Sequence, residues 1–118
     1  MRLEVLSDDG DVLRLQSVGR VVDVDLAWEH DPLGDLLGDR GYARRVLLSL
    51  DGSDHIDSSG LARLLVWHRR LQEAGGMLVL HSIPIQVMET LNILRMELVL
   101  QLAPDESSAL ELARGESA

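Results

Sequence analysis

The sequence predicts an α/β fold, in which a mixed β-sheet with an N-terminal β-hairpin carries helices packed against it. Two observations predict this class. Apolar and polar residues alternate near the N-terminus, and the rest of the chain alternates short apolar runs with segments of helical periodicity. The length of 118 residues suits one hydrophobic core, and the chain contains no cysteine. We therefore expect a single domain over residues 1–118 that folds without disulfides.

The first two expected strands flank the turn residues Asp8-Asp9-Gly10. Glycine and aspartate tolerate the positive φ angles of tight turns, so the segment over residues 2–17 predicts a β-hairpin. The apolar positions that alternate on either side of the turn are Leu3, Val5, Leu13 and Leu15. A second alternation over residues 22–26 predicts a further extended stretch.

The remaining elements are expected to alternate between helix and strand, which implies parallel strand pairs joined by right-handed crossovers. In chain order they are a short helix from Asp31-Pro32, a central strand over residues 45–50, an amphipathic helix through Leu61, Leu64, Leu65, His68 and Leu71 that ends at Gly75-Gly76, a buried strand over residues 77–80, a helix from Pro84, a strand over residues 98–102, and a last helix opened by Pro104, Asp105 and Glu106.

The charge balance excludes several classes of partner. The formal net charge is −9, and the eleven basic residues are scattered arginines with only two adjacent pairs. No basic stripe is available to follow phosphates or an anionic membrane, so we expect neither nucleic acid nor membrane as a partner. The apolar runs are far shorter than the roughly 20 residues of a membrane-spanning helix, and the first ten residues lack the apolar block of a signal peptide. A soluble cytoplasmic protein is expected.

Common catalytic and cofactor motifs are missing. The four histidines lie too far apart along the chain to form a local pair of metal ligands, and no Gly-x-Ser-x-Gly nucleophile motif occurs. The glycine patterns that bind nucleotide phosphates are also absent. We therefore expect a protein without catalytic residues, metal or cofactor, which is not an enzyme.

The segment Asp57-Ser58-Ser59-Gly60 precedes the apolar face of the amphipathic helix and allows two interpretations. The N–H groups of a helix N-terminus lack intrahelical partners, so a serine there could carry a phosphate that the helix stabilises. Alternatively, Asp57 or Ser58 only caps the helix, a contribution of about 1 kcal/mol. These residues by themselves favour the cap, because such a short motif recurs by chance.

A resemblance to a known family adds weight to the first interpretation. The chain from about Arg45 to Ala113 resembles the STAS domain family, and in particular bacterial anti-sigma-factor antagonists. The segments that carry the resemblance are Val46-Leu47-Leu48-Ser49-Leu50, Ile56-Asp57-Ser58-Ser59-Gly60-Leu61, Glu73-Ala74-Gly75-Gly76, Met77-Leu78-Val79-Leu80 and the helix from Pro84. The resemblance implies that Ser58 is phosphorylated, with Asp57, Ser59 and Gly60 as its neighbourhood.

The resemblance also implies a mechanism of partner switching. Unmodified protein would bind an anti-sigma factor that is also a serine kinase, phosphorylation of Ser58 would end that binding, and a PPM-type phosphatase would reset it. The acids Asp23 and Asp25 match an acidic stretch of the family and are implied partner contacts. The alternative is a STAS scaffold or transporter-associated module whose serines are never phosphorylated, and a phosphorylated fraction in the native protein would distinguish the two.

Overall fold

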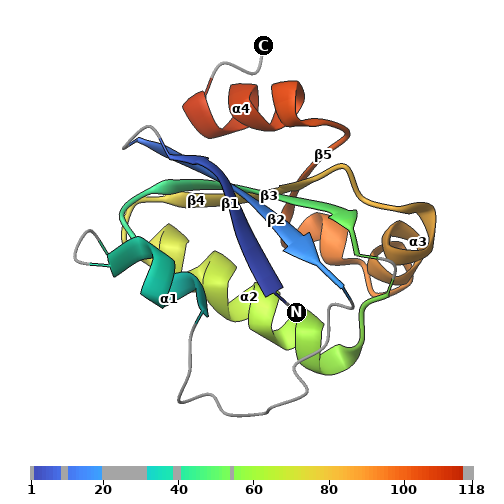
Figure 1. Cartoon of the computed structure of the whole chain (residues 1–118). Coiled ribbons are helices and arrows are strands. Elements are labelled where there is room, and N and C mark those ends of the chain that lie inside the picture. Colours follow the sequence, from blue (N-terminus) through green and yellow to red (C-terminus); the bar gives the residue numbers. More distant parts are fainter. Residues whose placement is uncertain (1, 9–10, 20–31, 39–40, 54, 116–118) are drawn as a thin grey trace.

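A computed structural model of the chain describes residues 2–8, 11–19, 32–38, 41–53 and 55–115. Five strands form one sheet in the order β1-β2-β3-β4-β5 (Figure 1). The elements are β1 (Arg2–Asp8), β2 (Val12–Val18), α1 (Pro32–Leu37), β3 (Arg45–Gly52), α2 (Ser58–Glu73), β4 (Met77–His81), α3 (Ile85–Ile93), the 3₁₀ helix η2 (Met96–Leu98), β5 (Gln101–Ala103) and α4 (Glu106–Arg114).

The sheet is mixed, as the sequence predicts. β1 and β2 pair antiparallel, with Val5 opposite Leu15, which confirms the N-terminal hairpin. The other neighbouring pairs, β2 with β3, β3 with β4 and β4 with β5, are parallel. The expected stretch over residues 22–26, with Asp23 and Asp25, lies outside the described residues.

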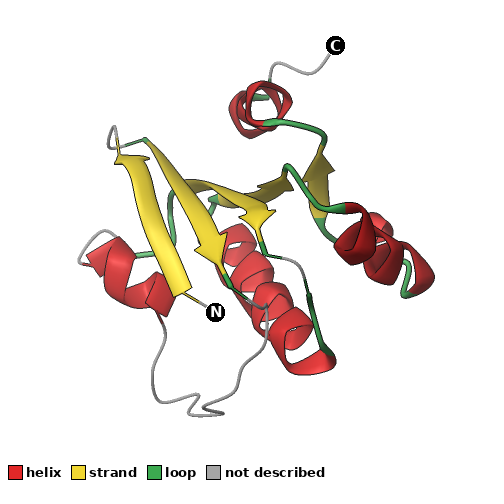
Figure 2. Cartoon of the chain, turned by 45° about the vertical axis from the view of Figure 1, so that its right-hand side comes forward, coloured by secondary structure: helices red, strands yellow, loops and turns green. Residues whose placement is uncertain are grey.

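Helices cover the sheet on both faces (Figure 2). Val46, Leu48 and Leu50 of β3 pack in one cluster with apolar residues of α1, α2 and α3, whereas Leu47 packs in a second cluster with Ala109 of α4. Successive side chains of a strand point to opposite faces, so a strand covered on both sides needs a continuous apolar run. This arrangement explains the run of apolar residues in β3 and confirms β3 as a central strand.

The last strand differs from its prediction over residues 98–102. β5 begins only at Gln101, and Leu98 is instead the final residue of η2, with 75% of its surface exposed. The carbonyl of Met96 accepts hydrogen bonds from the N–H groups of Val99 and Leu100, at 3.0 and 2.8 Å. This tight turn keeps Leu98 out of the sheet, because its backbone follows a 3₁₀ path rather than an extended one.

The residues that the structure describes include no helix with both the length and the apolar character needed to cross a bilayer.

Candidate functional site

The N-terminus of α2 decides between the two capping alternatives. Asp57 has extended backbone angles, and its Oδ1 accepts a hydrogen bond of 2.8 Å from the N–H of Gly60. The carbonyl of Asp57 accepts the next N–H, from Leu61, at 2.9 Å. Asp57 is therefore the N-cap, and Ser58 is the first residue of the helix.

The four motif residues differ in exposure. Asp57 and Ser58 are exposed, Ser59 is half-buried and Gly60 is buried. None of the hydrogen bonds among the described residues uses the hydroxyl of Ser58. The N–H groups of Gly60 and Leu61 are satisfied by Asp57, whereas the first-turn N–H groups of Ser58 and Ser59 have no partner within the helix. The structure thus presents the Ser58 hydroxyl on the surface, at the positive end of a helix dipole.

The loop that leads from β3 to this helix is anchored to β2 by two buried serines. The hydroxyl of Ser53 donates to Ser17, with 2.9 Å to its Oγ and 3.2 Å to its carbonyl oxygen, and the N–H of Ser53 donates to Leu50 at 2.9 Å. We did not single out either serine from the sequence. The alternation of Leu13, Leu15 and Ser17 places Ser17 on the buried face and is the one signal that could have indicated it.

An open cleft of about 640 Å³ lies where the parallel strands end. Its lining consists of Gly19 after β2, residues 51–53 at the end of β3, residues 82–84 after β4, and Pro104 after β5. Among the described residues of this lining, Asp51 supplies the one charged side chain. Ser58 does not belong to it, so the phosphorylation candidate and the cleft are separate features of the same edge of the sheet.

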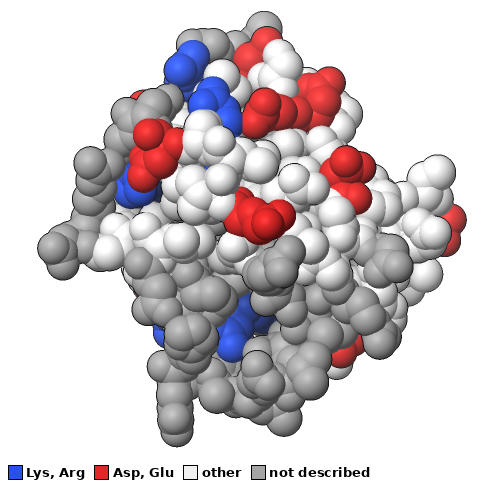
Figure 3. Space-filling model, in the orientation of Figure 1, with Lys and Arg blue, Asp and Glu red and all other residues white. Residues whose placement is uncertain are grey.

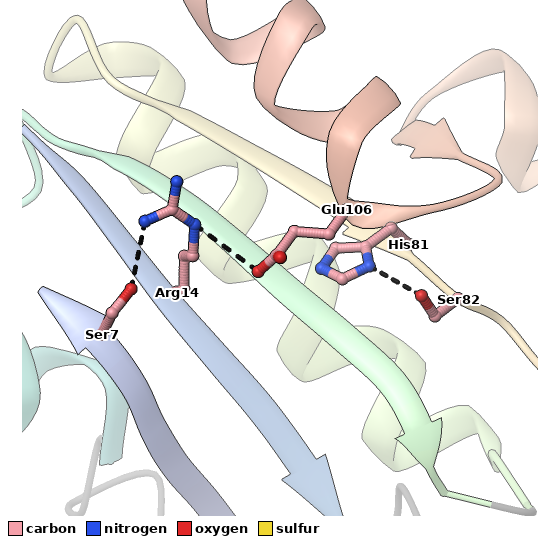
Figure 4. Close-up of polar contacts among 5 residues, drawn as sticks. All are labelled: Ser7, Arg14, His81, Ser82 and Glu106. Atoms are coloured by element: carbon pink, nitrogen blue, oxygen red, sulfur yellow. Dashed lines mark hydrogen bonds and ion pairs between the residues drawn. The ribbon is translucent and has the colours of Figure 1, made fainter.

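A polar cluster joins α4 to the sheet on the opposite face from α2 (Figure 4). Arg14 donates to the hydroxyl of Ser7 at 3.1 Å and pairs with Glu106 at 3.5 Å. His81 is buried, and its Nδ1 lies 2.9 Å from the hydroxyl of Ser82. Desolvation lowers the pKa of His81 below its ordinary value, while Glu106 and Asp105 partly oppose this shift. The Arg14–Glu106 pair of this cluster links β2 to the first turn of α4.

The described residues contain no group of three His, Cys, Asp or Glu side chains that could hold a metal ion.

The cap assignment leads to a first prediction. Asp57→Ala should lower the free energy of unfolding by about 1 kcal/mol, because Gly60 loses its acceptor, whereas Ser58→Ala should change it by less than about 0.5 kcal/mol. The sequence alone left Ser58 as a candidate cap with a larger cost, and the geometry at Asp57 corrects this. Urea unfolding of both variants, followed by circular dichroism, measures the difference. A greater loss for Ser58→Ala than for Asp57→Ala would contradict the assignment.

Comparisons with known proteins identify the class to which this fold belongs. The sequence pattern of the STAS domain matches residues 8–109. The chain belongs to the STAS domain family. No curated protein matches the sequence at a significant level.

Three solved structures illustrate the similarity of fold. A putative anti-sigma factor antagonist from Thermotoga maritima has 19% sequence identity and a TM-score of 0.79, over 96% of this chain and 93% of that one. The unphosphorylated form of the anti-sigma factor antagonist SpoIIAA has 16% identity and a TM-score of 0.69, over 99% and 98%. A serine-to-glutamate variant of RsbS from Moorella thermoacetica has 17% identity and a TM-score of 0.71, over 98% and 97%.

Proposed function

We propose that this protein is an anti-sigma-factor antagonist that regulates transcription in the cytoplasm through phosphorylation of Ser58. The observation that supports the proposal most is the position of Ser58, exposed at the first turn of α2 directly after a cap that another residue provides. Since Asp57 caps the helix, the fold does not need the Ser58 hydroxyl for capping. A serine in this place is available to a kinase without loss of a stabilising contact.

Phosphorylation at Ser58 would act through charge rather than through unfolding. A phosphoryl group adds about −1.5 to −2 charges, which the positive end of α2 tolerates. The exposed carboxylate of Asp57 is adjacent in sequence, so the added charge enlarges an acidic surface. A partner that binds this surface must remove water from it, and an unpaired charge makes that step costly. Binding should therefore end while the domain stays folded.

The proposed partner is an anti-sigma factor that is also a serine kinase, and a PPM-type phosphatase reverses the modification. By the family resemblance, Asp23 and Asp25 contribute to the contact with the kinase. The protein itself performs no catalysis in this scheme and needs no cofactor. The three solved structures described above support the proposal through their fold, since two of them are described as anti-sigma factor antagonists, one putatively.

Phosphosite mapping tests the proposal. The full chain, with Ser58→Ala and Ser59→Ala as matched variants, is incubated with ATP and an anti-sigma kinase from its source organism, and tandem mass spectrometry locates the phosphate. We expect phosphate on Ser58 in the wild type and in Ser59→Ala, and none in Ser58→Ala, because Ser58 is exposed and Ser59 is half-buried.

The same mass-spectrometric measurement on protein isolated from its native cell distinguishes the switch from the alternative, a scaffold whose serines are never phosphorylated. A phosphorylated fraction at Ser58 supports the switch. Phosphate confined to Ser59, or its absence both in the cell and after treatment with the kinase, would reject the switch and favour a scaffold that is never phosphorylated.

A further inference from the structure

Close contacts join the end of β2 to the end of β3, where the two strands lie side by side (Figure 1). They involve Ser17, Gly19, Gly52 and Ser53, which we call the β2–β3 lock. Besides the bond between the two serine hydroxyls, the N–H of Gly19 donates to the carbonyl of Gly52 at 3.0 Å. A Cβ atom at Gly52 would lie 2.9 Å from the carbonyl oxygen of Ser17, so this approach requires glycine.

The lock is buried and lies just before the candidate phosphorylation site. Ser17 and Ser53 expose 0% and 1% of their surface, and Ser58 follows Ser53 by five residues. Between them, Ile56 packs in the core and Asp57 caps α2. The described part of the β3–α2 loop therefore has two buried anchors, Ser53 and Ile56, and the exposed Ser58 comes directly after the cap.

Hydroxyl groups are uncommon at positions as buried as these. The alternation of Leu13 and Leu15 in β2 continues to Ser17 on the same face, where another apolar side chain would suit the core. A buried hydrogen bond between neutral groups adds little net stability, because folding exchanges it for bonds to water. The bond does fix a distance and a direction, which apolar contact leaves looser. The lock therefore specifies the position of the loop more than it stabilises the fold.

Position matters for a serine that a kinase must reach. The Ser58 oxygen bonds to the γ-phosphorus of ATP, the bond from that phosphorus to ADP breaks, and the hydroxyl proton passes to a base of the kinase. Misplacement of the acceptor by about 1 Å can slow such a step about a hundredfold.

Surface charge offers a partner little help with this alignment. On the described part of the face drawn in Figure 3, acidic and basic side chains are dispersed among uncharged ones. A dispersed pattern gives a partner little electrostatic orientation. We therefore expect the placement of Ser58 to depend on the rigidity of its loop.

From these contacts we infer that Ser17 and Ser53 are positioning residues for the phosphorylation of Ser58. The bond between their hydroxyls sets where the β3–α2 loop presents Ser58 to the kinase. This inference rests on the proposed function and adds to it the part of the fold that aligns the acceptor. Loss of the bond displaces Ser58 in the kinase complex while the domain stays folded.

Steady-state phosphorylation kinetics of the full chain, with ATP and the anti-sigma kinase of its source organism, separate this role from a loss of stability. A partly unfolded variant offers less substrate, which raises the apparent KM and leaves kcat unchanged. A folded variant with a misplaced serine has a lower kcat. For Ser53→Ala we expect a kcat at least about fivefold lower than that of the wild type, with KM within about twofold.

A double variant dissociates position from stability. Ser53→Ala leaves the buried Ser17 hydroxyl without the partner that it has in the wild type, whereas Ser17→Ala/Ser53→Ala removes both hydroxyls. The double variant should therefore melt at a temperature equal to or above that of Ser53→Ala, because it leaves no orphaned hydroxyl. Its kcat should stay as low as that of Ser53→Ala, since the directional bond is still missing.

Ser7→Ala is the matched control for the kinetics. It removes another serine hydroxyl with a side-chain partner, Arg14 at 3.1 Å, but on the edge strand β1. This variant should keep the kcat of the wild type.

Amide hydrogen exchange tests the lock without the kinase. The N–H groups of Ser53 and Gly60 donate to Leu50 and Asp57, at 2.9 and 2.8 Å, and both should exchange faster in Ser53→Ala than in the wild type. The N–H of Ser108, which donates to the cap of α4 at 2.8 Å, should exchange at the wild-type rate.

The positioning role and the proposed function fail in different ways. A wild type that takes no phosphate on Ser58 shows that the proposed function is wrong, and the positioning role falls with it. If the wild type is phosphorylated on Ser58, three results would overturn the positioning role alone. They are an unchanged kcat in Ser53→Ala, a kcat that recovers with stability in the double variant, and unchanged exchange of the Gly60 N–H in Ser53→Ala.

Discussion

Gly76→Ala should lower the free energy of unfolding by about 3 kcal/mol or more, a large part of the roughly 5–15 kcal/mol typical of a domain. A Cβ atom at this position would lie 2.2 Å from the carbonyl oxygen of Arg44 and 2.6 Å from that of Tyr42. Both are backbone atoms and cannot rotate away. The Arg44 carbonyl also accepts the N–H of Met77 at 3.1 Å, so a displacement here breaks the junction between β3 and β4.

The neighbouring glycine provides the control for this prediction. Gly75 has a φ of +88°, but no atom lies within 4 Å of the place that an alanine methyl group would take, so Gly75→Ala bears only the conformational cost of about 1–2 kcal/mol. Urea unfolding of the wild type and both variants, monitored by circular dichroism, measures the two losses. If Gly76→Ala proved no more harmful than Gly75→Ala, the close approach to Arg44 would not constrain the fold.

Ser58→Asp should weaken binding to the proposed anti-sigma kinase about a hundredfold, or roughly 2–3 kcal/mol, without unfolding the domain. The carboxylate would lie at the positive end of α2, so the free energy of unfolding should change by less than about 1 kcal/mol. In the complex, the new carboxylate at position 58 is desolvated next to the exposed Asp57. The motif residues 57–60 include no basic side chain that could pair with it. Calorimetric titration gives the affinity, and thermal melts give the stability.

Ser58→Asn separates charge from size in this experiment, because asparagine matches aspartate in volume and is neutral. We expect Ser58→Asn to bind more tightly than Ser58→Asp. Equal affinities for the wild type and Ser58→Asp, with equal melting temperatures, would reject an electrostatic switch at this position and leave the scaffold interpretation.

The elements that the sequence predicted well are those whose burial repeats along the chain. Alternation at Leu13 and Leu15 predicted β2, and the spacing of Leu61, Leu64 and Leu71 predicted α2, because each periodicity records directly which side chains face the core. The prediction of a strand over residues 98–102 was wrong for its first three residues, because β5 begins only at Gln101. The apolar residues of this segment are spaced like those of a strand, but Leu98 and Val99 are exposed in and after a 3₁₀ turn.

The sequence by itself determined the fold class, the place of the Asp57-Ser58 motif at a helix start and the family resemblance, since all three depend on local order along the chain. Only the tertiary structure decided that Asp57 and not Ser58 caps α2, because that choice depends on backbone angles at one residue. It also decided that Ser53 bonds to Ser17 and that Gly76 touches the Arg44 backbone. These contacts join residues about 30 or more positions apart, and the packing of strands and crossovers, which no local pattern records, brings them together.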